Sequence, residues 1–224
     1  PKFNEINWHR TILANLKHYQ PEYNSIIPER LIGYGRMRES LREVVLCIDR
    51  SGSMAQSVVY ASIFGAVMAS LPALKTQMVL FSTQVVDITD KLSDPVDALF
   101  GVQLRGGTNI AKALAYCEQL ITTPAQTLLV LITDLFEGNK DKGELVERIA
   151  RFSAEGTHVI TLLALNDQGT PKFNRAIAAE LVDIGIPAFA CTPALFPDLM
   201  GAALAKRDIG EWAAANGIVT APFN

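Results

Sequence analysis

Apolar positions along the chain follow two alternating patterns. Continuous runs rich in β-branched residues indicate strands buried on both faces, over 44–48, 77–82, 127–133, 159–165 and 187–191. Patterns in which apolar residues recur every three or four positions indicate helices, over 57–71, 95–100, 110–122, 143–155, 173–184, 195–206 and 209–216. Strands that alternate with helices in this way predict a doubly wound α/β sheet with helices on both faces.

One further strand is expected over 85–89, directly after the 77–82 strand. The connection between them is too short for a helical crossover, so the two strands should pair antiparallel. We therefore expect a six-stranded, mostly parallel sheet with one antiparallel edge strand. The 224 residues are 49% hydrophobic and 19% charged, which is enough apolar material for a sizeable core.

The first 42 residues show a different organisation. Ile12, Leu16 and Tyr19 stand at i, i+4 and i+7 and predict an amphipathic helix over 4–19. Residues 20–42 contain several Pro, Gly and Arg residues, which indicates an irregular basic strap on the domain surface, or a contact surface for a partner or for upstream chain. We expect residues 1–42 to form this helix and strap and residues 43–224 to form the α/β domain. The first residue is Pro rather than Met, so we also expect a piece of a longer protein.

Oxygen-bearing side chains stand where predicted strands end or helices begin, at Asp49, Ser51, Ser53, Thr108 and Asp134. The carboxyl ends of parallel strands meet at one edge of a sheet, where ligands bind at the point at which the strand order reverses. Carboxylate and hydroxyl oxygens suit a small hard cation such as Mg²⁺. The sequence thus predicts a metal site at this edge.

In this order, the Asp-x-Ser-x-Ser stretch, the Thr and the second Asp resemble the metal-ion-dependent adhesion site of von Willebrand factor A (VWA) domains. The resemblance covers roughly residues 43–205. It implies that Ser51 and Ser53 bind Mg²⁺ or Mn²⁺ directly, and that Thr108 does so directly or through water. It also implies that Asp49 and Asp134 hold metal-bound waters and orient the serines. A metal held mainly by neutral hydroxyls stays electrophilic and can accept an Asp or Glu carboxylate from a partner protein.

Two stretches point to a narrower group within these domains. Asp49-Arg50-Ser51-Gly52-Ser53-Met54 and Ile132-Thr133-Asp134 resemble those of bacterial CoxE-like proteins, which carry a C-terminal A domain behind a helical region. Such proteins work with MoxR-type AAA+ ATPases in the assembly or maturation of other proteins. The resemblance implies that this chain is the C-terminal part of a cytoplasmic adaptor between such an ATPase and its client.

Two other functions stay open at this point. A Mg²⁺-dependent hydrolase could use Asp49 as nucleophile, although such enzymes want a second carboxylate two residues later, where Ser51 stands. A structural scaffold could carry the site without using it. The chain contains no Walker A or Gly-x-Ser-x-Gly sequence, so we expect a binding module and not an enzyme.

Net charge, the length of the apolar runs and the cysteines limit the possible functions further. A net charge of −3 does not indicate a nucleic-acid partner, and no apolar run is long enough to span a membrane. Cys47, Cys117 and Cys191 are expected to be buried, reduced thiols.

We also expect specific roles for residues close to the predicted metal site. Asn109 should cap the following helix, and Glu137 should lie on the loop surface. Gly52, Gly106 and Gly107 should allow a close approach of the backbone and positive φ angles.

Overall fold

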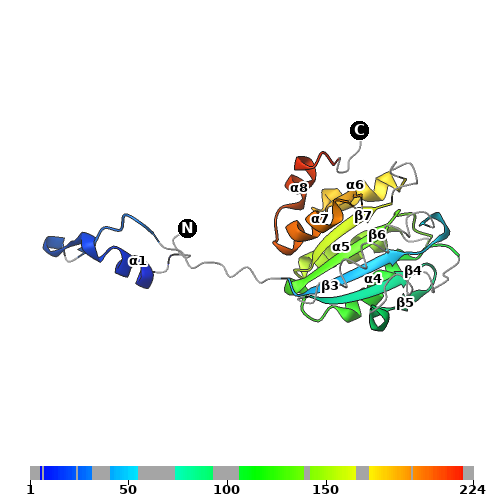
Figure 1. Cartoon of the computed structure of the whole chain (residues 1–224), viewed down its shortest axis with the longest axis horizontal. Helices are drawn as coiled ribbons and strands as arrows, with labels where there is room; N and C mark the ends of the chain where they lie inside the picture. Colours follow the sequence, from blue (N-terminus) through cyan, green and yellow to red (C-terminus); the bar gives the residue numbers. More distant parts are fainter. Residues whose placement is uncertain are drawn as a thin grey trace. The chain divides into compact units, whose positions relative to one another are not determined.

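The computed structural model describes residues 6, 8–23, 25–31, 41–54, 74–92, 106–138, 142–164, 172–192 and 194–218, with the side chains of Ser53 and Lys142 left out. The chain forms two compact units, Pro1–Glu39 and Ser40–Asn224 (Figure 1). The helices expected over 57–71 and 95–100 lie outside the described residues.

The larger unit is built on a sheet of six strands in the order β5-β4-β3-β6-β7-β8 (Figure 1). The strands are β3 (Glu43–Asp49), β4 (Lys75–Phe81), β5 (Val85–Asp87), β6 (Thr127–Thr133), β7 (His158–Leu163) and β8 (Ala188–Ala190). β5 pairs antiparallel with β4, and the other neighbouring strands pair parallel. The prediction of a mostly parallel sheet with one antiparallel edge strand is therefore confirmed.

Helices cover both faces of this sheet (Figure 1). They are α4 (Ile110–Leu120), α5 (Lys142–Ala154), α6 (Arg175–Asp183), α7 (Phe196–Leu204) and α8 (Ile209–Ala215). Successive side chains of a strand point to opposite faces. Val45 and Cys47 of β3 accordingly join the core under α4, α5 and α6, whereas Val44 and Leu46 join the core under α7 and α8. Burial on both faces explains why these strands read as continuous apolar runs.

The strand order reverses between β3 and β6. The chain first adds β4 on one side of β3 and later returns to place β6 on the other side. In open α/β sheets, the ligand crevice lies outside the carboxyl ends of the strands at such a point. Asp49 ends β3, and Asp134 directly follows β6, so the fold places both carboxylates at this crevice.

Ion pairs on the outer side of α5 connect it to α4. Arg148 pairs with Glu144 of its own helix, at 2.8 Å, and Arg151 pairs with Glu118 of α4, at 3.6 Å. The helix expected over 173–184 ends one residue earlier, at Asp183. Ile184 is exposed, because the chain turns there to bury Ile186 instead.

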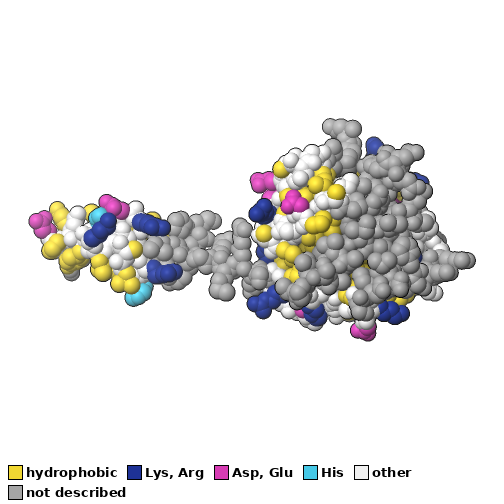
Figure 2. Space-filling model, in the orientation of Figure 1, with side chains coloured by type: hydrophobic (Ala, Val, Ile, Leu, Met, Phe, Trp, Pro, Cys, Tyr) yellow, Lys and Arg dark blue, Asp and Glu magenta, His cyan; other side chains and the backbone are white. Residues whose placement is uncertain are grey.

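The smaller unit differs from the predicted long helix and irregular strap. Its elements are α1 (Trp8–Ala14), η2 (Leu16–His18), β1 (Tyr19–Gln20), η3 (Pro21–Tyr23) and β2 (Ser25–Ile26), and β1 pairs antiparallel with β2. The predicted apolar face is exposed, whereas Thr11 and Asn15 are buried. The Asn15 side chain donates to the carbonyls of Thr11 and Arg30 and accepts from the amides of Glu29 and Arg30, which ends the helix. Figure 2 shows the apolar side chains on the surface of this unit.

The three cysteines lie as the sequence predicts. Cys47, Cys117 and Cys191 are all buried and form no disulfide, as predicted. Burial raises the pKa of the Cys47 and Cys191 thiols, which makes both poor nucleophiles.

Within the described parts of the chain, none of the helices combines the length and the apolarity that a membrane span requires.

The core predicts a clear effect of one substitution. Phe189 is fully buried, and its ring lies 6.2 Å from that of Trp212, centroid to centroid. Phe189→Ala should lower the free energy of unfolding by about 3–5 kcal/mol, because it removes the buried ring and leaves a cavity. Urea unfolding followed by circular dichroism measures this. Substitution of the exposed Phe136 by Ala is the control and should change stability by less than about 1 kcal/mol; equal losses for both would contradict this account of the core.

Candidate metal centre

Asp49 is the most tightly held residue of the crevice. Its side chain is fully buried at the end of β3. One carboxylate oxygen accepts a hydrogen bond from the amide of Ser51, at 2.8 Å, and the other accepts from the hydroxyl of Thr133, also at 2.8 Å. The side chain of Ser51 adds a further hydrogen bond to this carboxylate. The ends of β3 and β6 are therefore linked through a single carboxylate.

The loop after β6 continues from this link. The hydroxyl of Thr133 donates to Asp49 and accepts from the amide of Leu135, at 3.1 Å. Leu135 adopts a φ of 58°, in the left-handed region that is costly for a residue with a Cβ, and its side chain is fully buried. The turn sends the next side chain, Phe136, toward solvent, where it is 45% exposed.

Asp134 lies at the start of the same loop and is buried. Its carboxylate accepts a hydrogen bond from the amide of Phe136, at 3.1 Å, and its carbonyl accepts from the amide of Asn174, at 2.8 Å. The charge of Asp134 contributes to raising the pKa of Asp49, which shows that the two carboxylates interact electrostatically. The fold thus brings together two acids that stand far apart in the sequence.

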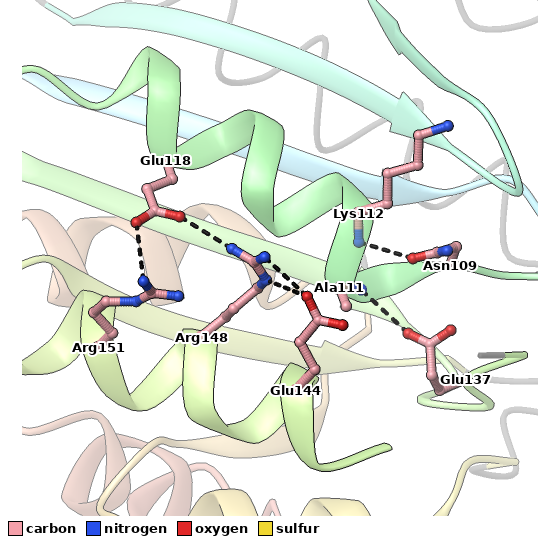
Figure 3. Close-up of polar contacts among 8 residues, drawn as sticks. All are labelled: Asn109, Ala111, Lys112, Glu118, Glu137, Glu144, Arg148 and Arg151. Carbon is pink, nitrogen blue, oxygen red and sulfur yellow. Dashed lines mark hydrogen bonds and ion pairs between the residues drawn. The ribbon is translucent and has the colours of Figure 1, made fainter. Parts of the chain in front are cut away.

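Thr108 comes to the crevice from the loop that precedes α4. It is buried, and its carbonyl accepts a hydrogen bond from the amide of Gly138, at 2.9 Å. A Cβ at Gly138 would lie 2.7 Å from that same carbonyl oxygen, so the close approach of the two loops requires glycine. Asn109 caps α4 by accepting from the amide of Lys112, as predicted (Figure 3).

Glu137 corrects the expectation of a loop-surface residue. It is buried, and its carboxylate accepts hydrogen bonds from the amides of Ile110 and Ala111, at 2.7 and 3.2 Å. Figure 3 shows the side chain reaching from its loop to the first turn of α4. The acid satisfies amides that have no partner within the helix, and its negative charge faces the positive end of the helix dipole. Together with Gly138 it fixes the loop of Thr108 against the loop of Asp134.

The two remaining predicted site residues, Ser51 and Ser53, lie in the chain that follows β3. Ser51 is buried beside Asp49, whereas Ser53 belongs to the turn η4 (Gly52–Met54) and its side chain lies outside the described residues. Of the three glycines that were expected to need positive φ angles, Gly106 has one, at 115°; Gly52 and Gly107 do not.

The electrostatics of the crevice favour a cation. Burial, the largest cause, raises the pKa of Asp49 from 3.8 to about 6, and hydrogen bonds from Ser51 and Thr133 offset part of this effect. Two buried acids that interact are costly to ionise together unless a positive charge lies between or beside them. The hydroxyls of Ser51 and Thr108 add neutral oxygen donors, so this set fits a hard divalent cation. In the described residues, no group of three or more His, Cys, Asp and Glu side chains forms a metal cluster of another kind.

This sheet, with its oxygen donors on the loops after β3 and β6 and before α4, defines a VWA-type α/β domain, a class of protein-interaction modules. A family model described as VWA domain containing CoxE-like protein matches residues 1–200. The chain belongs to this family.

One curated relative and two solved structures are similar to the chain. YehP of Escherichia coli K12, described as an uncharacterized protein, is 35% identical over 195 residues, which are 86% of this chain and 51% of YehP. The chain therefore spans about half the length of this relative. An aerotolerance-related membrane protein from Bacteroides fragilis has a TM-score of 0.56 at 17% identity, covering 76% of this chain and 99% of that one. A von Willebrand factor type A protein from Catenulispora acidiphila has a TM-score of 0.52 at 16% identity, covering 75% and 42%. These two structures share the fold.

The first prediction from the site concerns Glu137. Glu137→Ala should lower the free energy of unfolding by about 1–3 kcal/mol, because it leaves two amides at the start of α4 without an acceptor. Glu137→Gln keeps an acceptor oxygen and should lose less. Glu118→Ala, which breaks partly exposed ion pairs, is the control and should cost less than about 1 kcal/mol. Urea unfolding measures all three, and a Glu137→Ala variant as stable as the Glu118→Ala variant would refute the capping role.

The second prediction concerns Asp49 without metal. Its pKa is raised on folding, so it stabilises the folded state most when protonated, and this contribution is lost as the pH rises from 3.8 to about 6. In a chelator, Asp49→Asn should therefore gain stability relative to wild type, on the order of 1–3 kcal/mol, between about pH 4 and about pH 7. Thermal unfolding at several pH values measures this difference. The exposed Asp183→Asn is the control. A stability difference between wild type and the Asp49→Asn variant that does not vary with pH would contradict the assignment.

Proposed function

We propose that this domain binds partner proteins through a divalent metal ion, Mg²⁺ or Mn²⁺, held at the crevice between β3 and β6. One observation carries the proposal. The buried carboxylates Asp49 and Asp134 stand at the carboxyl ends of the neighbouring strands β3 and β6, with buried Ser51 beside Asp49. Buried Thr108 lies on a loop that Gly138 joins to the loop of Asp134. Ser53 completes the set that we assign to the metal.

The division of roles follows from the hydrogen bonds. Both oxygens of Asp49 already accept hydrogen bonds, so this residue is suited to orient Ser51 and a metal-bound water rather than to act as the main ligand. The hydroxyls of Ser51, Ser53 and Thr108 would then hold the metal. A metal bound mainly by neutral oxygens supplies an electrophilic position that an Asp or Glu carboxylate of the partner can occupy.

The surface beside the crevice suits a protein contact. Phe136 offers an exposed aromatic ring next to Asp134, and Gly106 and Gly107 leave exposed backbone beside Thr108. Aromatic side chains are enriched at the centres of protein interfaces. We assign Phe136 to the contact that the metal anchors.

The family supports a proposal for the partner. We assign to the chain an adaptor role in the cytoplasm, in which it links a MoxR-type AAA+ ATPase to a client protein that is being assembled or matured. The resemblance to CoxE-like proteins supports this assignment. We propose no catalytic activity for the domain itself, since Ser51 stands where a hydrolase with Asp49 as nucleophile would carry its second carboxylate.

Metal binding is tested first by calorimetry. Wild type should bind Mg²⁺ and Mn²⁺ and melt at a higher temperature in their presence, whereas Ser51→Ala/Ser53→Ala should lose both effects with its fold intact. Ser153→Ala, on the exposed end of α5, is the matched control. The absence of both binding heat and a melting shift in wild type would refute the metal site and favour the scaffold alternative.

Partner binding is tested by affinity capture from cell extract with Mg²⁺ or with EDTA, followed by mass spectrometry. An AAA+ ATPase should be captured by wild type only when metal is present, and by Ser51→Ala/Ser53→Ala in neither condition. Capture that is unchanged by EDTA and by the double substitution would separate the partner from the metal and overturn the proposed mechanism.

A further inference from the structure

A cavity of about 590 Å³ lies at the edge of the sheet opposite the metal centre. The starts of β7 and β8, the ends of α5 and α6, and the turn between α7 and α8 line it. This volume is in the range of small-molecule sites, about 300–1,000 Å³. Its walls combine apolar side chains, among them Val182, Ile186 and Ile209, with polar and charged ones.

Three helices end at this cavity with the same hydrogen-bonded turn. In α5, α6 and α7, the third residue after the last residue of the helix donates its amide to a carbonyl five residues earlier: Thr157 to Phe152, Ile186 to Leu181, and Arg207 to Ala202. This turn places the preceding residue in the left-handed region, where glycine is preferred. Gly156 and Gly185 fill that position in α5 and α6, with φ angles of 96° and 82°.

Lys206 fills the same position in α7, with a φ of 51°. A residue with a Cβ costs about 1 kcal/mol or more in this conformation, so a lysine there carries a strain that glycine would avoid. Its ammonium group donates to the carbonyl of Ala125, at 3.0 Å, which uses one of its three hydrogens. The side chain lines the cavity with donors to spare.

The charges of the lining favour an anion. Lys206 and Arg207 are both cationic, and Lys206 lies near enough to His158 to help burial lower the pKa of that imidazole. Among the described residues that line the cavity, Asp208 is the acidic one. It accepts from the amide of Glu211 at the start of α8, at 2.9 Å, so its charge is directed at that helix end.

We propose that this cavity binds a small amphiphilic anion. The carboxylate or phosphate head lies against Lys206 and Arg207, and the apolar body lies against Val182, Ile186 and Ile209. The site is separate from the metal centre and does not depend on it.

The test is a titration of the full chain followed by amide NMR. The probes are octanoate and phenyl phosphate as amphiphilic anions, octanamide as the neutral counterpart, and inorganic phosphate as a head group alone. At least one of the two anions should shift the amides of Thr157 and Lys206 in a saturable way and bind about tenfold more tightly than octanamide or inorganic phosphate. The anion that binds identifies the head group.

Variants separate ligand binding from folding. Lys206→Gly relieves the backbone strain, so it should fold and melt close to wild type while binding the anion about tenfold more weakly. Arg207→Gln should also weaken binding, whereas Arg175→Gln, exposed on α6, is the matched control and should not. The proposal is overturned if neither anion shifts these amides, if octanamide binds as well as the tighter-binding anion, or if Lys206→Gly and Arg207→Gln bind as wild type does.

Discussion

The candidate metal site of this domain depends on the burial of one carboxylate, that of Asp49. A buried negative charge is unfavourable, and the raised pKa of Asp49, about 6, measures that cost after three hydrogen bonds have reduced it. The same hydrogen bonds fix the carboxylate in one orientation and connect β3 to β6 across the point where the strand order reverses. The fold therefore holds an incompletely compensated charge at the place where an open α/β sheet binds ligands.

The loop after β6 fixes the positions of the groups around that charge. Its side chains have distinct roles, since Thr133 holds Asp49, Leu135 enters the core, Phe136 faces solvent, and Glu137 caps α4. Gly138 then contacts the carbonyl of Thr108. Because these contacts are made by backbone groups and buried side chains, the loop is preorganised, and little conformational entropy remains to be lost when a cation or a partner binds.

Sequence reasoning was most successful where local pattern and burial agree. The continuous run of β6 and the short connection from β4 to β5 determine a buried parallel strand and an antiparallel edge, and both are present. It failed for Glu137, whose partners lie 26 and 27 residues earlier in the chain and leave no periodic signal. It also failed for the first helix, where a polar residue, Asn15, and not the apolar stripe, organises the unit. The pattern of Asp and Ser residues predicts a metal site, but the hydrogen bonds that assign a role to each oxygen depend on strand pairing that no local pattern contains.

The two edges of the sheet can be compared through backbone strain. Among the described residues, Leu135 and Lys206 are the two non-glycine residues with positive φ angles, one beside the candidate metal site and the other beside the opposite cavity. At Leu135 the strained backbone conformation has a structural role, because it buries the Leu135 side chain and directs the Phe136 side chain outward. At Lys206 the hydrogen bond to Ala125 lies on an exposed surface, where such a bond adds little to stability. Glycine satisfies the same turn at the ends of α5 and α6, so the turn itself does not require a lysine. All three helices end at the cavity, but α7 brings a cationic residue there where α5 and α6 have glycine, and a binding role accounts for this lysine where the folding of the helix end does not.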